Sequence, residues 1–159
     1  MKLLQKVVSV KSEVLIHHEP NNWRQCYSRI QKYRSSHQAP VDVVGCGELG
    51  RGKENVKRFQ TLIALMLSPQ TRDEMTARAV TQLREFAKGA FDRDLDLQTI
   101  SLIKIGALEE CINCVGFYRT KARHIKKMGD LLNESESKDV PDSFEELVKL
   151  PGVDRKSVV

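Results

Sequence analysis

The feature that most constrains the fold of this 159-residue chain is a strongly amphipathic segment that begins near residue 56. Its apolar side chains recur at spacings of three and four residues: Val56, Phe59, Leu62, Ile63, Met66 and Leu67. This spacing places them on one face of an α-helix, and no other segment of the chain is as hydrophobic. Proline cannot continue the helical hydrogen-bond ladder, so Ser68-Pro69-Gln70 predicts the helix end. We expect the apolar face to be buried against other helices.

The remaining sequence also shows mainly helical periodicity. Asn21 and Asn22 can cap a first helix at 23–33. Further helices are predicted at 71–86, 97–105, 107–114, 118–132 and 144–149, the last one capped by Asp142 or Ser143. Loops are predicted at 35–53, which holds Pro40 and several glycines, and at 133–139. The alternating pattern of a β-strand is absent from the sequence, and the predicted fold class is all-α.

The charge balance is modestly basic, with a net charge of +5 and a pI of about 9.1. In the helix predicted at 118–132 we place the basic residues on the outer side: Arg119, Lys121, Arg123, Lys126 and Lys127. Such a surface agrees with a polyanionic partner, because each phosphate contact releases a counterion. An ordinary solvated helix is the alternative. No run reaches the roughly 18 apolar residues of a membrane helix, so no membrane partner is expected.

The chain has four cysteines: Cys26, Cys46, Cys111 and Cys114. Cys111 and Cys114 form a C-x-x-C pair inside a predicted helical segment, which invites a metal or redox interpretation. No second pair follows, and His124 is the only nearby candidate ligand. Structural burial is therefore favoured over a metal site, and no metal-ligating residue is predicted.

The segment Leu150-Pro151-Gly152-Val153-Asp154-Arg155-Lys156-Ser157 has the pattern of a helix–hairpin–helix. Glycine lets the backbone approach a phosphate closely, and the amides that open the second helix can donate to it. Such contacts position a duplex without reading its sequence. An ordinary Pro-Gly turn between packed helices is the alternative that this turn alone leaves open.

The hairpin sequence LPGVDRK resembles that of the endonuclease III family of DNA glycosylases. Three further segments are similar to motifs of that family in the same order: LIALMLSPQTRDEMTARAVTQL (62–83), CVGFYRTKARHIKKMGDLL (114–132) and VPDSFEELVKLPGV (140–153). NWRQCYSRIQKYRSSHQAPVDVVG (22–45) resembles its eukaryotic branch in particular. The resemblance covers residues 22–159.

This resemblance implies the fold of the helix–hairpin–helix glycosylase superfamily. We expect most of the six-helix barrel domain, truncated within the hairpin and without its C-terminal helices and iron–sulfur domain. The predicted organisation is a weakly ordered N-terminal arm at 1–21, an N-terminal helix and loop at 22–53, and a helical glycosylase domain at 54–159 that ends in an incomplete helix–hairpin–helix.

The resemblance assigns the catalytic role to Lys156. In the family, the matching amine attacks C1′ of the sugar, forms a Schiff base and sets up β-elimination. Only a neutral amine is nucleophilic, so the site has to lower the pKa of this lysine, and Arg155 is a candidate contributor of positive charge. A surface lysine that binds phosphate is the alternative for Lys156.

The resemblance also assigns DNA-binding residues. Gln70 matches the residue that fills the space left by the flipped nucleotide, and a helix-capping glutamine is the alternative. Phe117 matches the bulky residue that wedges between bases of the opposite strand, and a core phenylalanine is the alternative. In the hairpin, Gly152, Val153 and Arg155 are predicted to contact DNA.

Two departures from the family pattern stand out. Asp154 replaces the second glycine of the hairpin, where a side chain is expected to strain the turn and a negative charge to weaken DNA binding. The family's catalytic aspartate and the four cysteines of its [4Fe-4S] cluster would follow Val159, so we expect this chain to ligate no cofactor.

The implied function is base-excision repair of oxidised pyrimidines by a bifunctional DNA glycosylase and AP lyase, with activity expected to be impaired or absent in this chain. A catalytically dead DNA-binding or interaction fragment, such as a truncated isoform, is the alternative. The expected partner is double-stranded DNA with oxidised pyrimidines or abasic sites, bound by a monomer. The implied location is the nucleus, with the mitochondrion left open.

Overall fold

The computed structural model describes residues 21–155 of the chain. These residues divide into two units between Gln38 and Ala39. The predicted N-terminal arm at 1–21 lies almost wholly outside the described residues.

Within residues 21–38, the described part of the first unit, the chain forms the helix α2 (Trp23–Arg34), at the position predicted for it. Asn22 occupies the N-cap position in a left-handed conformation, with φ 77° and ψ 6°, and its side chain makes no capping hydrogen bond. The predicted side-chain cap is therefore wrong for Asn22. After the helix, the Arg34 guanidinium donates to the carbonyl oxygen of His37 at 2.6 Å, and the ring of His37 stacks on Tyr33.

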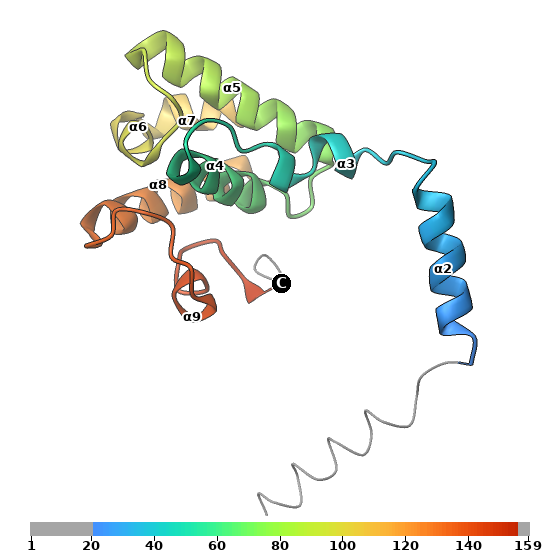
Figure 1. Cartoon of the computed structure of the whole chain (residues 1–159). Helices are drawn as coiled ribbons and strands as arrows, with labels where there is room; N and C mark the ends of the chain where they lie inside the picture. Colours follow the sequence, from blue (N-terminus) through green and yellow to red (C-terminus); the bar gives the residue numbers. More distant parts are fainter. Residues whose placement is uncertain (1–20, 156–159) are drawn as a thin grey trace, which may run out of the picture. The chain divides into compact units, whose positions relative to one another are not determined.

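The second unit is built from helices connected by short loops (Figure 1). Their bounds are α3 (Val41–Val44), the 3₁₀ helix η1 (Cys46–Glu48), α4 (Glu54–Leu67), α5 (Asp73–Phe91), α6 (Leu97–Leu102), α7 (Ile105–Cys111), α8 (Tyr118–Glu134) and α9 (Phe144–Leu147). None of residues 21–155 lies in a β-strand, and the predicted all-α class is confirmed. Within this described range, no helix has both the length and the apolar character to cross a membrane.

Helix α8 lies at the centre of the packing, in contact with α4, α6 and α7, while α4 also packs against α5. The apolar face predicted for α4 turns inward, and α5 and α8 each bury one face as well. The largest side chains with less than 2% exposure include Ile63, Leu67, Leu83, Ile100, Leu108, Ile112, Ile125 and Met128. Burial of these side chains is the main source of stability for the unit.

Several boundaries differ from the predicted ones. The loop predicted at 35–53 contains α3 and η1, because Pro40 supplies a helical φ and the Asp42 carboxylate accepts from the amide of Ala39 at 2.7 Å. Helix α5 continues to Phe91 instead of ending at Phe86, and the two phenylalanine rings pack edge to face. Helix α6 is shorter than predicted, since Ile103 already has an extended backbone.

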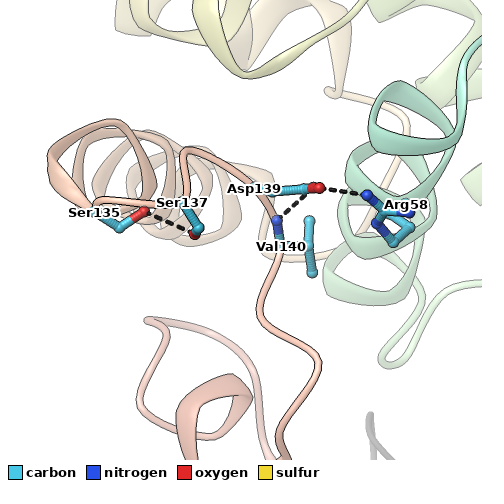
Figure 2. Close-up of polar contacts among 5 residues, drawn as sticks. All are labelled: Arg58, Ser135, Ser137, Asp139 and Val140. Carbon is cyan, nitrogen blue, oxygen red and sulfur yellow. Dashed lines mark hydrogen bonds and ion pairs between the residues drawn. The ribbon is translucent and has the colours of Figure 1, made fainter.

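A polar link joins α4 to the segment that leads into α9 (Figure 2). The Arg58 guanidinium donates to the Asp139 carboxylate, whose other oxygen accepts from the amide of Val140 at 2.7 Å. The hydrogen bond from Arg58 holds the pKa of Asp139 below its ordinary value. Just before this link, the hydroxyls of Ser135 and Ser137 contact each other at 3.5 Å. The link holds the loop after α8 against α4.

We predict that Gly129→Ala destabilises the second unit by about 1–3 kcal/mol, the usual cost of overfilling a packed core. A Cβ at Gly129 would lie 2.5 Å from Cγ2 of Ile100, which is fully buried. Gly89→Ala is the matched control, because nothing lies within 4 Å of a Cβ at that exposed helical position. It should be neutral or stabilising by up to about 1 kcal/mol. Urea unfolding followed by circular dichroism tests both, and equal effects would contradict the close packing of α6 on α8.

We also predict that Asp139→Asn reduces the loss of stability in acid. Because its pKa is lowered in the folded protein, the Asp139 carboxylate stabilises the fold above its ordinary pKa of 3.8, and this contribution is lost as the pH falls through the folded value. The substituted amide has no charge to lose, so the melting temperature of this variant should fall less between pH 5 and pH 3, with a difference of a few degrees at most for so exposed a pair. Arg58→Met, which removes the hydrogen-bonding partner of Asp139, should show the same smaller fall.

Candidate nucleic-acid interface

The predicted hairpin forms a tight turn shortly after α9. The amide of Val153 donates to the carbonyl oxygen of Leu150 at 3.1 Å, and both side chains belong to the buried core. Gly152 is exposed and has a φ of 79°, which side chains with a Cβ rarely adopt. The apolar residues therefore anchor the turn and leave the glycine backbone at the surface. The predicted contact of Val153 with DNA stays a prediction.

The hairpin lies directly against α8. A Cβ at Gly152 would be 2.8 Å from Nδ1 of His124, so glycine is required here both for its conformation and for the close approach. Asp154 and Arg155 follow as exposed residues. Asp154 is outside the left-handed region, so the predicted strain at this position is not found. Lys156, the predicted nucleophile, lies outside the described residues.

Gln70 and Phe117 come from separate segments and lie close together. Both are exposed and both are left-handed, with φ values of 56° and 55°. A Cβ at Gly116, beside Phe117, would be 3.6 Å from the carbonyl oxygen of Gln70. Phe117 is 69% exposed, so the alternative of a core phenylalanine is wrong. Ser68 is the C-cap of α4, so Gln70 does not occupy the capping position either.

Lys121 joins these two segments from inside the protein. We predicted it on the outer, basic side of the helix, but only 9% of it is exposed. Its ammonium donates to the carbonyl oxygens of Leu67 at 2.7 Å and Pro69 at 2.8 Å, and to the Thr71 hydroxyl at 3.1 Å. Burial lowers the pKa of this ammonium. Helical spacing could have predicted this burial, because Lys121 stands four residues before Ile125 and therefore on the same, inner face of the helix.

Lys126 is a second correction to the predicted basic side of α8. Its half-buried ammonium donates to the carbonyl oxygens of Ile100, Ser101 and Ile103, at 3.1, 2.5 and 3.1 Å. These carbonyls end α6, where a cation is favourable. The exposed basic residues of α8 in this stretch are therefore Arg119, Arg123 and Lys127. They flank His124, against which the hairpin packs.

The cysteines of the C-x-x-C pair are half-buried and free. The Cys114 thiol lies 3.7 Å from both the carbonyl oxygen of Met75 and the side-chain oxygen of Gln82. Burial, assisted by the nearby Glu110 carboxylate, raises the pKa of Cys111. In the described part of the chain, no three His, Cys, Asp or Glu side chains gather as metal ligands. The cysteines of this stretch do not fit the four-thiolate set of an iron–sulfur cluster.

The surface around the first half of α8 thus combines three elements. An exposed glycine turn can approach a phosphate backbone, exposed arginines can neutralise phosphates, and two fixed side chains project from adjacent turns. Phosphate contacts of this kind position a duplex, and a projecting apolar side chain can enter between base pairs. The sequence pattern predicted the turn, and the family resemblance pointed to Gln70 and Phe117, but neither indicated the buried lysine that connects these two residues.

Comparison with known proteins gives one consistent family. A family model described as the HhH-GPD superfamily base excision DNA repair protein matches residues 63–157. The endonuclease III homolog of Schizosaccharomyces pombe is 41% identical over 138 residues, which cover 86% of this chain and 38% of that protein. The endonuclease III-like protein 1 of Gallus gallus is 38% identical over 140 residues, covering 87% of this chain and 47% of that protein.

Two solved structures share the fold. A trapped endonuclease III–DNA covalent intermediate, in an estranged-adenine complex, aligns with a TM-score of 0.64 and 25% identity over 87% of this chain and 56% of that one. A non-covalent endonuclease III–DNA complex aligns with the same TM-score and coverage and 28% identity. The chain thus spans about half the length, or less, of these relatives.

Proposed function

Because this chain belongs to the endonuclease III-like family within the HhH-GPD superfamily of base excision DNA repair proteins, we propose that it binds damaged double-stranded DNA and carries out the family's excision chemistry through Lys156. The proposed substrates are oxidised pyrimidines and the abasic sites left after their removal. The observation that carries the proposal is the pair formed by Gln70 and Phe117, two exposed residues on adjacent turns at the start of α8, the helix on which the hairpin packs.

Each part of the interface supplies one step of binding. The Gly152 turn and Arg155 would contact the phosphates of one strand, and Arg119 and Arg123 would add positive charge beside them. Gln70 would then fill the space left by a nucleotide that has turned out of the stack, and Phe117 would wedge between bases of the opposite strand. Extrusion of a nucleotide costs a few kcal/mol in unstacking and lost pairing, and filling the gap offsets part of this cost.

The chemical step requires a neutral amine at the sugar. Nζ of Lys156 would add to C1′ of the open-chain abasic sugar, and loss of water would give the imine. The imine then acidifies C2′, and loss of a proton from C2′ breaks the bond between C3′ and its phosphate oxygen. Excision of an intact damaged base is harder, because charge that develops on the sugar has to be stabilised by a further group.

We predict that borohydride traps a covalent adduct between the chain and DNA that contains a preformed abasic site. The adduct should be lost in Lys156→Ala and retained in Lys149→Ala, which changes an exposed lysine two residues after the end of α9. Denaturing gels of the protein–DNA adduct give the measurement. An adduct that persists in Lys156→Ala would show that Lys156 is not the nucleophile. DNA binding without any adduct would favour the alternative, a catalytically inactive DNA-binding fragment, and release of oxidised pyrimidines would favour the complete excision activity.

The hairpin gives a separate prediction about affinity. Asp154→Gly removes a negative charge beside the proposed phosphate contact, and we expect tighter binding to abasic-site DNA by roughly 1 kcal/mol. Glu145→Ala, which removes an equal charge from the exposed start of α9, should change the affinity less. Fluorescence anisotropy at fixed salt concentration measures both variants. If Asp154→Gly leaves the affinity unchanged, the hairpin does not contact DNA.

A further inference from the structure

Lys121 is attached to both of the segments that carry the projecting side chains. Its ammonium binds three oxygens of the turn after α4, contributed by Leu67, Pro69 and Thr71. These oxygens come from the residues on either side of Gln70. Its backbone amide donates at 3.0 Å to the carbonyl oxygen of Phe117. One residue therefore fixes the Gln70 turn with its side chain and the Phe117 turn with its main chain.

Stability alone is a weak explanation for this lysine. A buried ammonium loses its hydration, and three good hydrogen bonds roughly compensate for that loss. Replacement of buried charged groups by apolar side chains of similar volume is often neutral or stabilising. A methionine would fill the same space between α4 and α8, but it could not donate hydrogen bonds to the three oxygens. What only the lysine provides is therefore the set of hydrogen bonds that fixes the position of the Gln70 turn.

That position matters because both turns have an unfavourable backbone conformation. Left-handed conformations are unfavourable for residues other than glycine, and they persist only where surrounding contacts impose them. Gln70 and Phe117 both have this conformation. Without the three hydrogen bonds, the turn at 68–71 would be free to relax, and the spacing between the two side chains would change.

We propose that Lys121 is a positioning residue for damage recognition, which sets the distance between Gln70 and Phe117 so that one can fill the space of the flipped nucleotide while the other enters the opposite strand. The inference rests on the proposed function and deepens it, since it concerns the same interface. Lys121 itself is buried behind the two turns and makes no contact with DNA. Its effect should therefore appear in the preference for a damaged duplex, and not in the salt-dependent affinity for any duplex.

Lys126 provides a matched control on the same helix. It is also a partly buried lysine whose ammonium binds three oxygens, but those oxygens belong to the end of α6. Lys121→Met and Lys126→Met remove the same chemistry from two places in one core. Both should change the melting temperature by similar, small amounts, whereas only Lys121→Met should change the recognition of damage.

The experiment compares binding of the 159-residue chain to an intact duplex and to a duplex with a tetrahydrofuran abasic analogue, with 2-aminopurine opposite the analogue. For the wild type we expect tighter binding to the analogue and a rise in 2-aminopurine fluorescence when the base unstacks. In Lys121→Met the preference should fall about tenfold, the scale of one or two hydrogen bonds to a charged group, and the fluorescence rise should be lost. Affinity for the intact duplex should stay unchanged, and Lys126→Met should behave as the wild type in both respects.

Other outcomes separate the two proposals. If the wild type has no preference for the abasic analogue, the proposed function fails, and the role of Lys121 fails with it. If the wild type has the preference and Lys121→Met keeps both the preference and the fluorescence rise, only the positioning role is wrong. An equal loss in Lys126→Met would also overturn it, because general destabilisation would then explain the effect. If Lys121→Met does not fold, Thr71→Val removes one of the three oxygens, and it should reduce the preference in the same direction by a smaller factor.

Discussion

Helix α8 has to bury one face against three other helices, and most of the second unit depends on how it does so. Ala122, Ile125 and Met128 are completely buried on that face. Gly129 allows α6 to approach so closely that a Cβ would meet Ile100 at 2.5 Å. Because so little space remains at this contact, α8 cannot rotate or slide without separating from its neighbours. Everything attached to α8 is therefore held in a fixed position.

Three parts of the candidate interface are attached to α8. The Phe117 turn begins the helix, the Gln70 turn is bound to it through Lys121, and the hairpin packs on it at His124. These parts are far apart in the sequence, and two of them lie on short turns with little packing of their own. A recognition surface made from loops is accurate only when a rigid element supports it. In this molecule the buried face of α8 provides that support, so core packing and recognition depend on the same helix.

The sequence was most informative where burial determines structure. The apolar spacing in 56–67 and 118–132 identified α4 and α8 nearly to the residue, because a long helix can bury its apolar face in only one way. The short helices α3 and η1 were missed, since a helix of three or four residues is too short to show a repeated apolar pattern, and α3 depends on a local side-chain contact. Lys121 and Lys126 were placed outside because lysine is usually solvated, yet a long aliphatic chain can be buried when its ammonium reaches unpartnered carbonyls at a helix end. The role of Phe117 came from family resemblance. Phe117 lies in the turn before α8, where the helical repeat gives no information on burial.

The exposure of Phe117 and the backbone conformation of both turns are best understood as preparation for binding. An apolar side chain that is 69% exposed contributes little to the stability of the free protein. Two left-handed residues raise the free energy of the fold further. Because the free protein already has the exposed side chain and the two left-handed turns, insertion into a duplex requires no rearrangement of the turns. Less of the binding free energy is then lost in ordering them. On the proposed function, contacts that hold the turns from inside, such as those of Lys121, would contribute to affinity for damaged DNA without touching it.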